Sequence, residues 1–576
     1  MNNKKLTRVL SWLDTNILIL LSSVLLILIP LYPKLPLFDI IPGYLVRVRI
    51  EDFAVLLTLG IWMTQVLRKK IAWKTPLTIP IALYAVVGLL SVISAVVFTH
   101  TVPAQLLHIG KTSLHFFRYL EYFSIYFILV SAIKTKEHFK IIISVIAVTL
   151  ICITFYGIGQ KYWYWPVYST MNREFAKGIR LVLTEHARVQ STFGGHYDLG
   201  GYLVIVLPLI LSLIAVTKKY WRLLLVTSYL GGVWLIFVSS SRSSIGGYLV
   251  ACGIVILWQA LRNNTWRKKF SSFATMSLIF VLVHAFFLRN FGDDLFQRVE
   301  QTINSFPVIA KPYTASTTFI DHQWEFVYES GKKTIDGFFK RGASDDLANA
   351  FKVEKPINAV SIDQVLVASD TRPEPARPSD VYIEIPVYTQ VATTSADGTT
   401  TYSTVETPRD YSENAIAKGL SLAIRLDTLW PRALAGFYIN PLLGSGYATL
   451  TKESIGQFTE AESTDNNFLR TIGETGALGF VSFYGVAVLA IVRAWQLAKK
   501  KSLPVLEKGF AIGFIASSIG LFINAGAIDV FAASKVAFYY WAVTGILFAL
   551  TMIRPVSTIE KSIEKPVVKR RKTKQK

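Results

Sequence analysis

The stretch WLIFVSSSRSSIGGYLVACGIVIL, residues 234–257, decides how the rest of the chain is interpreted. It places one arginine, Arg242, between two apolar runs, with a few serines and glycines around it. An arginine at the centre of a bilayer costs at least about 2.5–3.5 kcal/mol, so charge inside a membrane is rare and mostly functional. Arg242 therefore either anchors a helix end at the lipid headgroups or serves a site, and the topology of the chain decides between the two.

Apolar runs like these recur along most of the chain. Hydrophobic residues make up 52% of the 576 residues and charged residues 17%, well below the roughly 25% of charged residues in soluble domains. Each run has close to the ~17–25 residues that a helix needs to cross a bilayer. The sequence predicts an all-α integral membrane protein with about twelve transmembrane helices. We expect them at 15–33, 51–67, 77–98, 115–133, 139–158, 199–216, 221–238, 244–261, 271–289, 475–497, 508–529 and 533–553.

The spans divide the chain into four parts. Residues 1–289 hold the first nine spans, and residues 290–474 form a large external loop that is too long to be a simple connection. Residues 475–553 hold the last three spans, and residues 554–576 form a basic cytoplasmic tail. A second substantial external loop, 159–198, lies within the first part.

The large loop contains an insertion at about 312–412. Its linker RPEPARPSD precedes alternating apolar and polar residues around Asp397-Gly398, a pattern typical of a small β-hairpin. The segment that follows, 414–438, has helical spacing that we expect Pro431 to break.

The net charge of +22 is not distributed as in a nucleic-acid-binding protein. Lysine and arginine gather in the short segments after the even-numbered spans and in the tail. Basic loops face the cytoplasm, so both termini are expected there, in a multi-pass protein of the cytoplasmic (inner) membrane. The expected surroundings are membrane lipids, with no nucleic-acid partner. No Cys or His spacing is typical of a metal site, so neither a metal nor a cofactor is predicted.

This orientation places several arginines on the external face, close to the membrane. Arg242 lies in a very short external loop, Arg188 precedes the sixth span, and Arg425 and Arg432 belong to the large loop. The guanidinium group suits two-pronged contact with phosphate, so arginines that converge here would fit a lipid-linked phosphate or diphosphate. The alternatives are a headgroup anchor for Arg242 and solvated helix positions for Arg425 and Arg432.

Four external segments carry a family resemblance. They are RVQSTFGGHYDLGGYL (188–203), SSSRSSIGGYL (239–249), NPLLGSGY (440–447) and DNNFLRTIGETGALG (465–479). In order, spacing and sidedness the chain resembles the O-antigen ligase and O-antigen polymerase superfamily of bacterial envelope glycan assembly. The resemblance covers nearly the whole membrane part and both ends of the large loop. It implies a metal-independent membrane glycosyltransferase that takes glycan from a polyprenyl-diphosphate-linked donor to a hydroxyl of a glycan, lipid or protein acceptor.

The resemblance also implies roles for individual residues. Arg188 and Arg242 would hold the diphosphate of the donor. Asp465 takes the position of the family's histidine in a His-Asn pair, because Gly476 and Gly479 follow at the expected distance. Asp465 would then act as the general base toward the acceptor hydroxyl, or only position the acceptor. The aspartate in place of histidine is a departure from the family pattern, as is the turn GGHYD in place of an Asn-Pro-Asn-like turn.

Other polar residues near these motifs are candidates for substrate binding. His196 either assists the reaction or is a turn residue. Asn466, Asn467 and Glu474 either hydrogen-bond sugar hydroxyls or cap the start of the tenth span.

Twelve spans alone would also suit a transporter or exporter of polysaccharide or small solutes. The span interiors carry few charges, and we find no inverted repeats of the kind that transporters show. The sequence leaves open whether the enzyme would be a ligase or a polymerase, and which sugars it would use.

Overall fold

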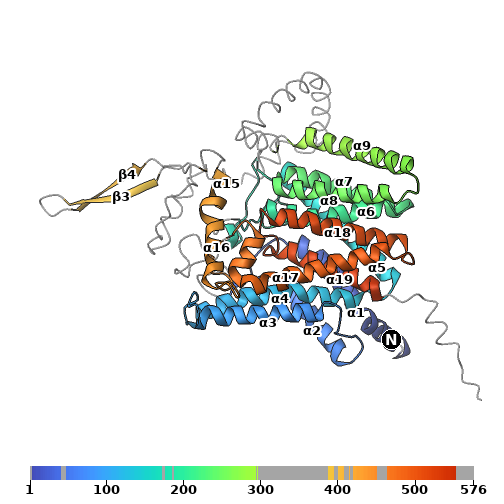
Figure 1. Ribbon diagram of the computed structural model, residues 1–576, viewed down its shortest axis with the longest axis horizontal. Helices are drawn as coiled ribbons and strands as arrows, with labels where there is room; N and C mark the ends of the chain where they lie inside the picture. Colours follow the sequence, from blue (N-terminus) through green and yellow to red (C-terminus); the bar gives the residue numbers. More distant parts are fainter. Residues whose placement is uncertain are drawn as a thin grey trace, which may run out of the picture.

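The protein is a bundle of long helices, seen in a computed structural model that describes residues 3–40, 47–171, 175–184, 187–292, 295, 387–394, 400–407, 414, 420–450 and 463–552 (Figure 1). Eleven helices within these residues are long and apolar enough to cross a membrane. The helices of the first part are α1 (Asn3–Leu31), α2 (Ile50–Leu67), α3 (Thr78–Val97), α4 (Leu106–Ala132), α5 (Lys136–Tyr162), α6 (His196–Ile214), α7 (Lys219–Val238), α8 (Arg242–Leu261) and α9 (Trp266–Phe291). Those of the second part are α15 (Leu420–Ile424), α16 (Trp430–Ile439), α17 (Asn467–Lys499), α18 (Val505–Ala525) and α19 (Ser534–Met552).

The predicted class, an α-helical multi-pass membrane protein, is confirmed, with eleven apolar spans where the sequence suggested about twelve. The remaining predicted span, 115–133, falls on α4, which is 27 residues long and packs against α19 and α3. Its first half carries Lys111, His115, Arg118 and Glu121, which make it more polar than the other eleven helices.

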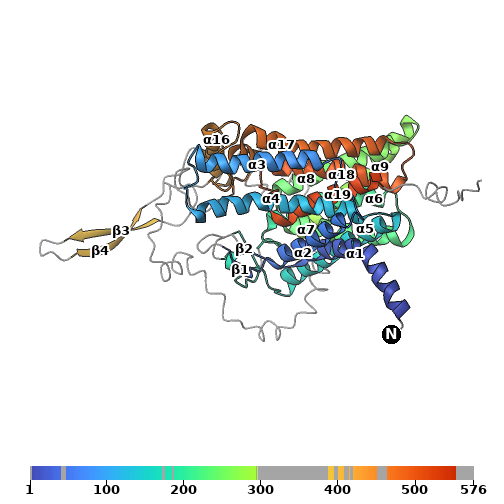
Figure 2. The ribbon, with the colours of Figure 1, turned by 90° about the horizontal axis from the view of Figure 1, so that it is seen from below.

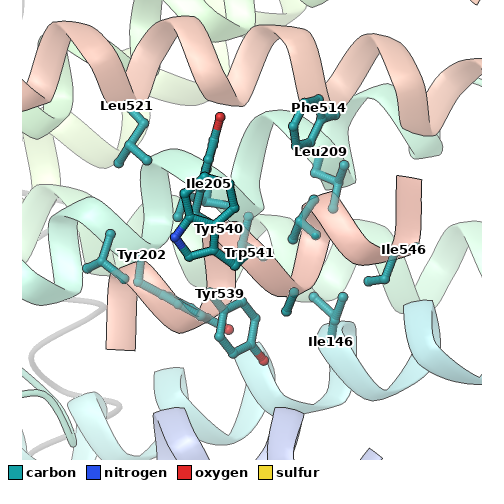
Figure 3. Close-up of a cluster of buried hydrophobic side chains, with 14 of the residues drawn as sticks. Ile146, Tyr202, Ile205, Leu209, Phe514, Leu521, Tyr539, Tyr540, Trp541 and Ile546 are labelled. Atoms are coloured by element: carbon teal, nitrogen blue, oxygen red, sulfur yellow. The ribbon is translucent and has the colours of Figure 1, made fainter. Parts of the chain in front are cut away.

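Helix α19 lies at the centre of the bundle and contacts α4, α6, α18 and α1. Its aromatic residues Tyr539, Tyr540 and Trp541 fill the core, and the Tyr539 ring packs edge-on against Tyr202 of α6 at 4.6 Å (Figure 3). The Tyr539 hydroxyl donates to the carbonyl of Leu26 at 2.6 Å, which satisfies a polar group that would otherwise be costly in an apolar interior. The last span therefore occupies a central position and packs against these helices of the bundle.

The two ends of the bundle differ in what they carry. The N-terminus lies at the end opposite α16 (Figure 2). By the order of the helices, the basic segments 68–74, 217–222 and 262–269 lie at the end of the N-terminus. The starts of α6, α8, α17 and α19 lie at the other end, together with α15 and α16.

Helix α17 is kinked at Gly476, where φ is 63° and ψ is −169°. This kink separates a short outer piece from the apolar part, which explains why the predicted span begins at 475. The turn 440–446 packs against the kink, and its two glycines have positive φ, 68° at Gly444 and 101° at Gly446. A Cβ on Gly444 would lie 2.4 Å from the backbone carbon of Glu474. The two glycines therefore allow the backbone of the turn to approach that of α17 closely.

Backbone hydrogen bonds join the turn to the kink. The kink frees amides and carbonyls of α17 from their helical partners, and buried backbone groups need replacements. The turn supplies them through these bonds: Ser445 N–H to Gly473 O (2.9 Å), Gly446 N–H to Glu474 O (2.9 Å), Ala477 N–H to Pro441 O (2.8 Å) and Leu478 N–H to Leu442 O (3.2 Å). The segment before the last three spans is therefore anchored on the outer end of α17.

The expectation that Pro431 breaks the external helix is wrong. Helix α15 continues through a π-helical turn, Arg425–Leu429, directly into α16. Proline has no N–H to donate and its ring crowds the preceding turn. The wider turn accommodates this, because the Trp430 N–H bonds to the Arg425 carbonyl, five residues back. The π-helical turn thus begins at Arg425, one of the arginines that the sequence predicted to bind phosphate.

Short antiparallel pairs of strands complete the described structure. Strands β1 (Phe38–Asp39) and β2 (Arg47–Val48) pair beside the start of α2. In the large loop, β3 (Val387–Thr394) pairs with β4 (Thr400–Thr407), with Val387 opposite Thr407. The Asp397-Gly398 turn, most of the insertion 312–412 and the tail 554–576 lie outside the described residues.

Candidate functional site

Three of the four predicted phosphate-binding arginines converge at the end of the bundle that carries α16. Arg242 is the first residue of α8, Arg188 lies in the segment that leads into α6, and Arg425 opens the π-helical turn. Arg242 is exposed, and both Arg188 and Arg425 lie close enough to repel its charge. We call these three residues the arginine cluster. Segments about 240 residues apart in sequence thus bring like charges together.

Arg188 is held by aromatic neighbours from the first turn of α6. Its Nη1 contacts Nε2 of His196, and its guanidinium lies 5.9 Å from the centre of the Tyr197 ring. The His196 side chain is buried and packs on the Tyr197 ring at 3.9 Å. Because an arginine can only donate, the contact fits a neutral imidazole whose Nε2 accepts. The arrangement gives His196 a part in orienting Arg188.

Arg425 forms an ion pair with the predicted catalytic residue Asp465. Nη2 of Arg425 lies 3.0 Å from Oδ2 of Asp465, and both side chains are partly exposed. The second carboxylate oxygen, Oδ1, lies 2.8 Å from the Ser463 hydroxyl. The structure therefore brings Asp465 to the edge of the arginine cluster, with its charge shared between Arg425 and a hydroxyl group.

The backbone of Asp465 is in the left-handed region, with φ of 50°. Aspartate tolerates this conformation better than most residues with a side chain, and surrounding contacts stabilise it further. Such positions concentrate at functional sites. Asp529, in the loop between α18 and α19, accepts from the amides on both sides of Asp465, and the Asp465 N–H itself donates to Ser463 Oγ at 3.2 Å.

Asn466 and Asn467 have structural partners. Asn466 is the N-cap of α17, and its side-chain oxygen accepts from the amides of Phe468 and Leu469 at 3.1 Å each. Asn467 is fully buried; its amide nitrogen donates to the Tyr484 hydroxyl at 2.9 Å and its oxygen accepts from the Phe531 N–H at 3.0 Å. For Asn466 the geometry matches the capping alternative, and Asn467 joins α17 to the loop that precedes α19.

Glu474 is also buried, in an ionic chain that the sequence did not predict. Its Oε1 lies 3.3 Å from Nε of Arg470, one helical turn earlier. Nη1 of Arg470 in turn lies 3.0 Å from Oδ2 of Asp529. The Glu474 carboxylate also accepts from the Ala448 N–H at 3.2 Å, so it ties α17 to the turn region before it. The sequence could have predicted this ion pair, because Arg470 and Glu474 are four residues apart and so lie on the same face of a helix.

Arg432 lies near the start of α16 and is half-buried. It follows Arg425 by seven residues, about two helical turns. Its role at the arginine cluster stays a prediction.

A second group of charged residues lies at the same end of the bundle, between α1, α2, α4, α6 and α19. Arg118 pairs with Asp52 and, at 3.0 Å, with Glu121. Lys34 lies 3.6 Å from Asp198 and 3.0 Å from the Ser534 hydroxyl. Burial lowers the pKa of the Lys34 ammonium, and the charge of Asp198 opposes that shift. We call Lys34, Asp198, Arg118, Asp52 and Glu121 the paired network.

Lys535 extends the paired network in the first turn of α19. Its ammonium is fully buried and donates to three backbone carbonyls, of Pro30 (3.0 Å), Tyr32 (2.6 Å) and Thr192 (2.8 Å). Three donors thus meet three acceptors, which is the full capacity of an ammonium group.

Comparison with known proteins yields no relative: no protein-family model matches the chain, and no characterised protein matches it significantly. Among the described residues, no group of three or more His, Cys, Asp and Glu is placed to hold a metal ion. The functional argument therefore proceeds from the arginine cluster and Asp465.

Proposed function

We propose that the protein is an integral-membrane glycosyltransferase of the O-antigen ligase or polymerase type. It would take a glycan from a polyprenyl-diphosphate-linked donor and transfer it to an acceptor hydroxyl at the external face of the cytoplasmic membrane. The observation that carries this proposal is the convergence of Arg188, Arg242 and Arg425 next to the ion-paired Asp465.

The arginine cluster suits a diphosphate for an electrostatic reason. Arg242 lies near the positive charges of Arg188 and Arg425, and Arg425 also pairs with Asp465. A diphosphate supplies several anionic oxygens at the level of the membrane surface, each able to accept from an arginine. Binding would replace repulsion within the cluster by charge-assisted hydrogen bonds.

The reaction needs positioning and charge stabilisation more than covalent chemistry by the protein. The acceptor oxygen would attack the anomeric carbon while the bond from that carbon to the diphosphate oxygen breaks. Asp465 would take the proton of the acceptor hydroxyl, and the arginines would stabilise the charge on the departing diphosphate. Arg425 contacts Asp465 and neighbours Arg242, so it would link the proton acceptor to the leaving-group site.

A transporter is the competing function, and one observation favours it. Within the helices, the Tyr248 hydroxyl bonds to the Tyr229 hydroxyl at 2.7 Å and to Nε2 of His284 at 2.6 Å. Transport sites commonly use polar groups at this depth. The three groups bond to one another, however, and His284 also bonds to the Phe280 carbonyl at 2.6 Å, so the chain serves equally to fasten α9 to α7 and α8.

Mass analysis of surface glycan tests the proposal. A strain that lacks this chain should make shorter glycan if the enzyme is a polymerase, or leave finished glycan unattached if it is a ligase. Complementation with Asp465→Asn should fail to restore glycan, and Arg222→Lys, an exposed arginine at the opposite end, should restore it. Unchanged glycan, or accumulation of donor on the cytoplasmic face, would contradict the proposal, and the second result would favour transport.

A further inference from the structure

Asp529 connects the outer loop between α18 and α19 to the segment that carries Asp465. It is 6% exposed and accepts hydrogen bonds with both carboxylate oxygens. Oδ1 accepts from the Asn466 N–H at 3.1 Å. Oδ2 receives three donors, namely Thr464 N–H (2.7 Å), Ser463 Oγ (3.0 Å) and Arg470 Nη1 (3.0 Å).

Two of these bonds flank Asp465 directly. Asp529 binds the amide before Asp465 and the amide after it, and the residue between them has a φ of 50°. Aspartate adopts this left-handed conformation more readily than most residues with a side chain, and hydrogen bonds to the flanking amides enforce it further. The buried carboxylate of Asp529 supplies that enforcement from a different part of the chain.

The same loop also reaches the partner of Asp465. The carbonyl of Ala527 accepts from Nη2 of Arg425 at 3.5 Å, the nitrogen that pairs with Asp465. The loop thus contacts Arg425 directly, through the Ala527 carbonyl, and contacts the two neighbours of Asp465 in the chain, Thr464 and Asn466, through Asp529. It sets where the two side chains meet.

We infer that Asp529 is a positioning residue, which holds the backbone on both sides of Asp465 and thereby directs the Asp465 carboxylate toward Arg425 and the acceptor. The effect on catalysis rests on the proposed function, whereas the clamp on the backbone does not. Asp529 and Asn466 are 63 positions apart in the sequence, so nothing in its local pattern reveals the pair.

The substitution Asp529→Asn removes the clamp with little change of size. An amide has one acceptor oxygen and one donor nitrogen, so its NH2 group must face either the Asn466 amide or the Thr464 amide and Arg470. One side of the turn would then lose its acceptor. Asp427→Asn is the matched control, because it removes one carboxylate charge from an exposed position two residues after Arg425.

Hydrogen–deuterium exchange of the full-length protein in detergent tests the clamp without any substrate. Amides protected by buried hydrogen bonds exchange only when the structure opens locally. In Asp529→Asn, exchange in residues 463–467 should be faster by about tenfold or more, and in Asp427→Asn it should match the wild type. Wild-type exchange rates in a folded Asp529→Asn protein would overturn the inference.

A double-mutant cycle tests whether the clamp acts through Asp465. Asp465→Asn should lower glycan transfer by about 100-fold, the lower range for loss of a general base. Asp529→Asn should lower transfer by about tenfold in the chain that contains Asp465, and by less than about twofold in the Asp465→Asn background. Equal losses in both backgrounds would overturn a positioning role, because the two residues would then act independently.

A milder variant covers the case in which Asp529→Asn does not fold. Ser463→Ala removes the exposed hydroxyl that lies 2.8 Å from Asp465 and 3.0 Å from Asp529. It should lower transfer by about threefold with Asp465 present and leave it unchanged without Asp465. Should the wild type show no transfer, the proposed function fails, and faster exchange in Asp529→Asn would still establish the clamp.

Discussion

The paired network around Arg118 and the arginine cluster around Arg242 lie at the same end of the bundle and differ in their charge balance. In the paired network, Arg118 faces both Asp52 and Glu121, and Lys34 faces Asp198. In the arginine cluster, Arg242 faces Arg188 and Arg425. A buried cation with its own carboxylate is a feature that the fold can satisfy by itself. Arginines gathered beside one another gain most from an anion that comes from outside.

The comparison requires both groups to face the same side of the membrane, and an accessibility experiment tests this with an all-or-none outcome. In a chain with Cys152 and Cys252 replaced by serine, we expect Ile179→Cys to react with a membrane-impermeant thiol reagent applied to spheroplasts. Tyr220→Cys, at a position that is even more exposed but lies at the basic end, should stay unlabelled until the membrane is opened. The reverse pattern would place the arginine cluster and the paired network in the cytoplasm.

Removal of a cation should lower stability more in the paired network than in the arginine cluster. Arg118→Ala leaves the carboxylates of Asp52 and Glu121 close together without their cation, which should cost about 3–5 kcal/mol of the free energy of unfolding. Arg242→Ala removes an exposed charge that two other arginines repel, so its loss of stability should be clearly smaller than that of Arg118→Ala. Thermal unfolding of both variants in the same detergent measures the difference. Equal losses would mean that the arginine cluster is also a structural feature.

A smaller effect separates capping from sugar binding at Asn466. Asn466→Ala removes the N-cap of α17 and should cost about 1 kcal/mol of stability. Asn466→Asp keeps a capping oxygen, so both stability and glycan transfer should stay close to wild type. A normal unfolding midpoint combined with strongly reduced transfer in Asn466→Asp would instead assign the amide to substrate.

Hydropathy predicted the helices well because the bilayer imposes one length and one composition on every span. Each predicted span coincides with a helix, and α4 is the one whose charged first half departs from the simple pattern. The convergence of Arg188, Arg242 and Arg425 was also predictable in outline, because topology confines them to one surface.

The remaining site residues depend on contacts that no local pattern encodes. Asp529 sits at the predicted end of a span, where a carboxylate is unremarkable, and its partners lie 59–66 residues earlier. The π-helical turn at Arg425 was missed because proline was taken only as a breaker, whereas the structure widens the preceding turn to accommodate it. Asn467 was predicted to bind sugar hydroxyls or to cap the tenth span, yet it is buried and bonds to the Tyr484 hydroxyl and the Phe531 N–H.

The central claim is that the arginine cluster binds a diphosphate, and binding of undecaprenyl diphosphate to the purified protein tests it most directly. Lysine keeps the charge of Arg242 but loses the planar, two-pronged contact. Arg242→Lys should weaken binding by about 2–5 kcal/mol, at least ~30-fold in Kd. Undecaprenyl monophosphate should bind more weakly to the wild type and respond less to the substitution, and Arg222→Lys should bind both lipids as the wild type does. Unchanged affinity of Arg242→Lys for the diphosphate would contradict the account and leave Arg242 as an anchor of α8 at the membrane surface.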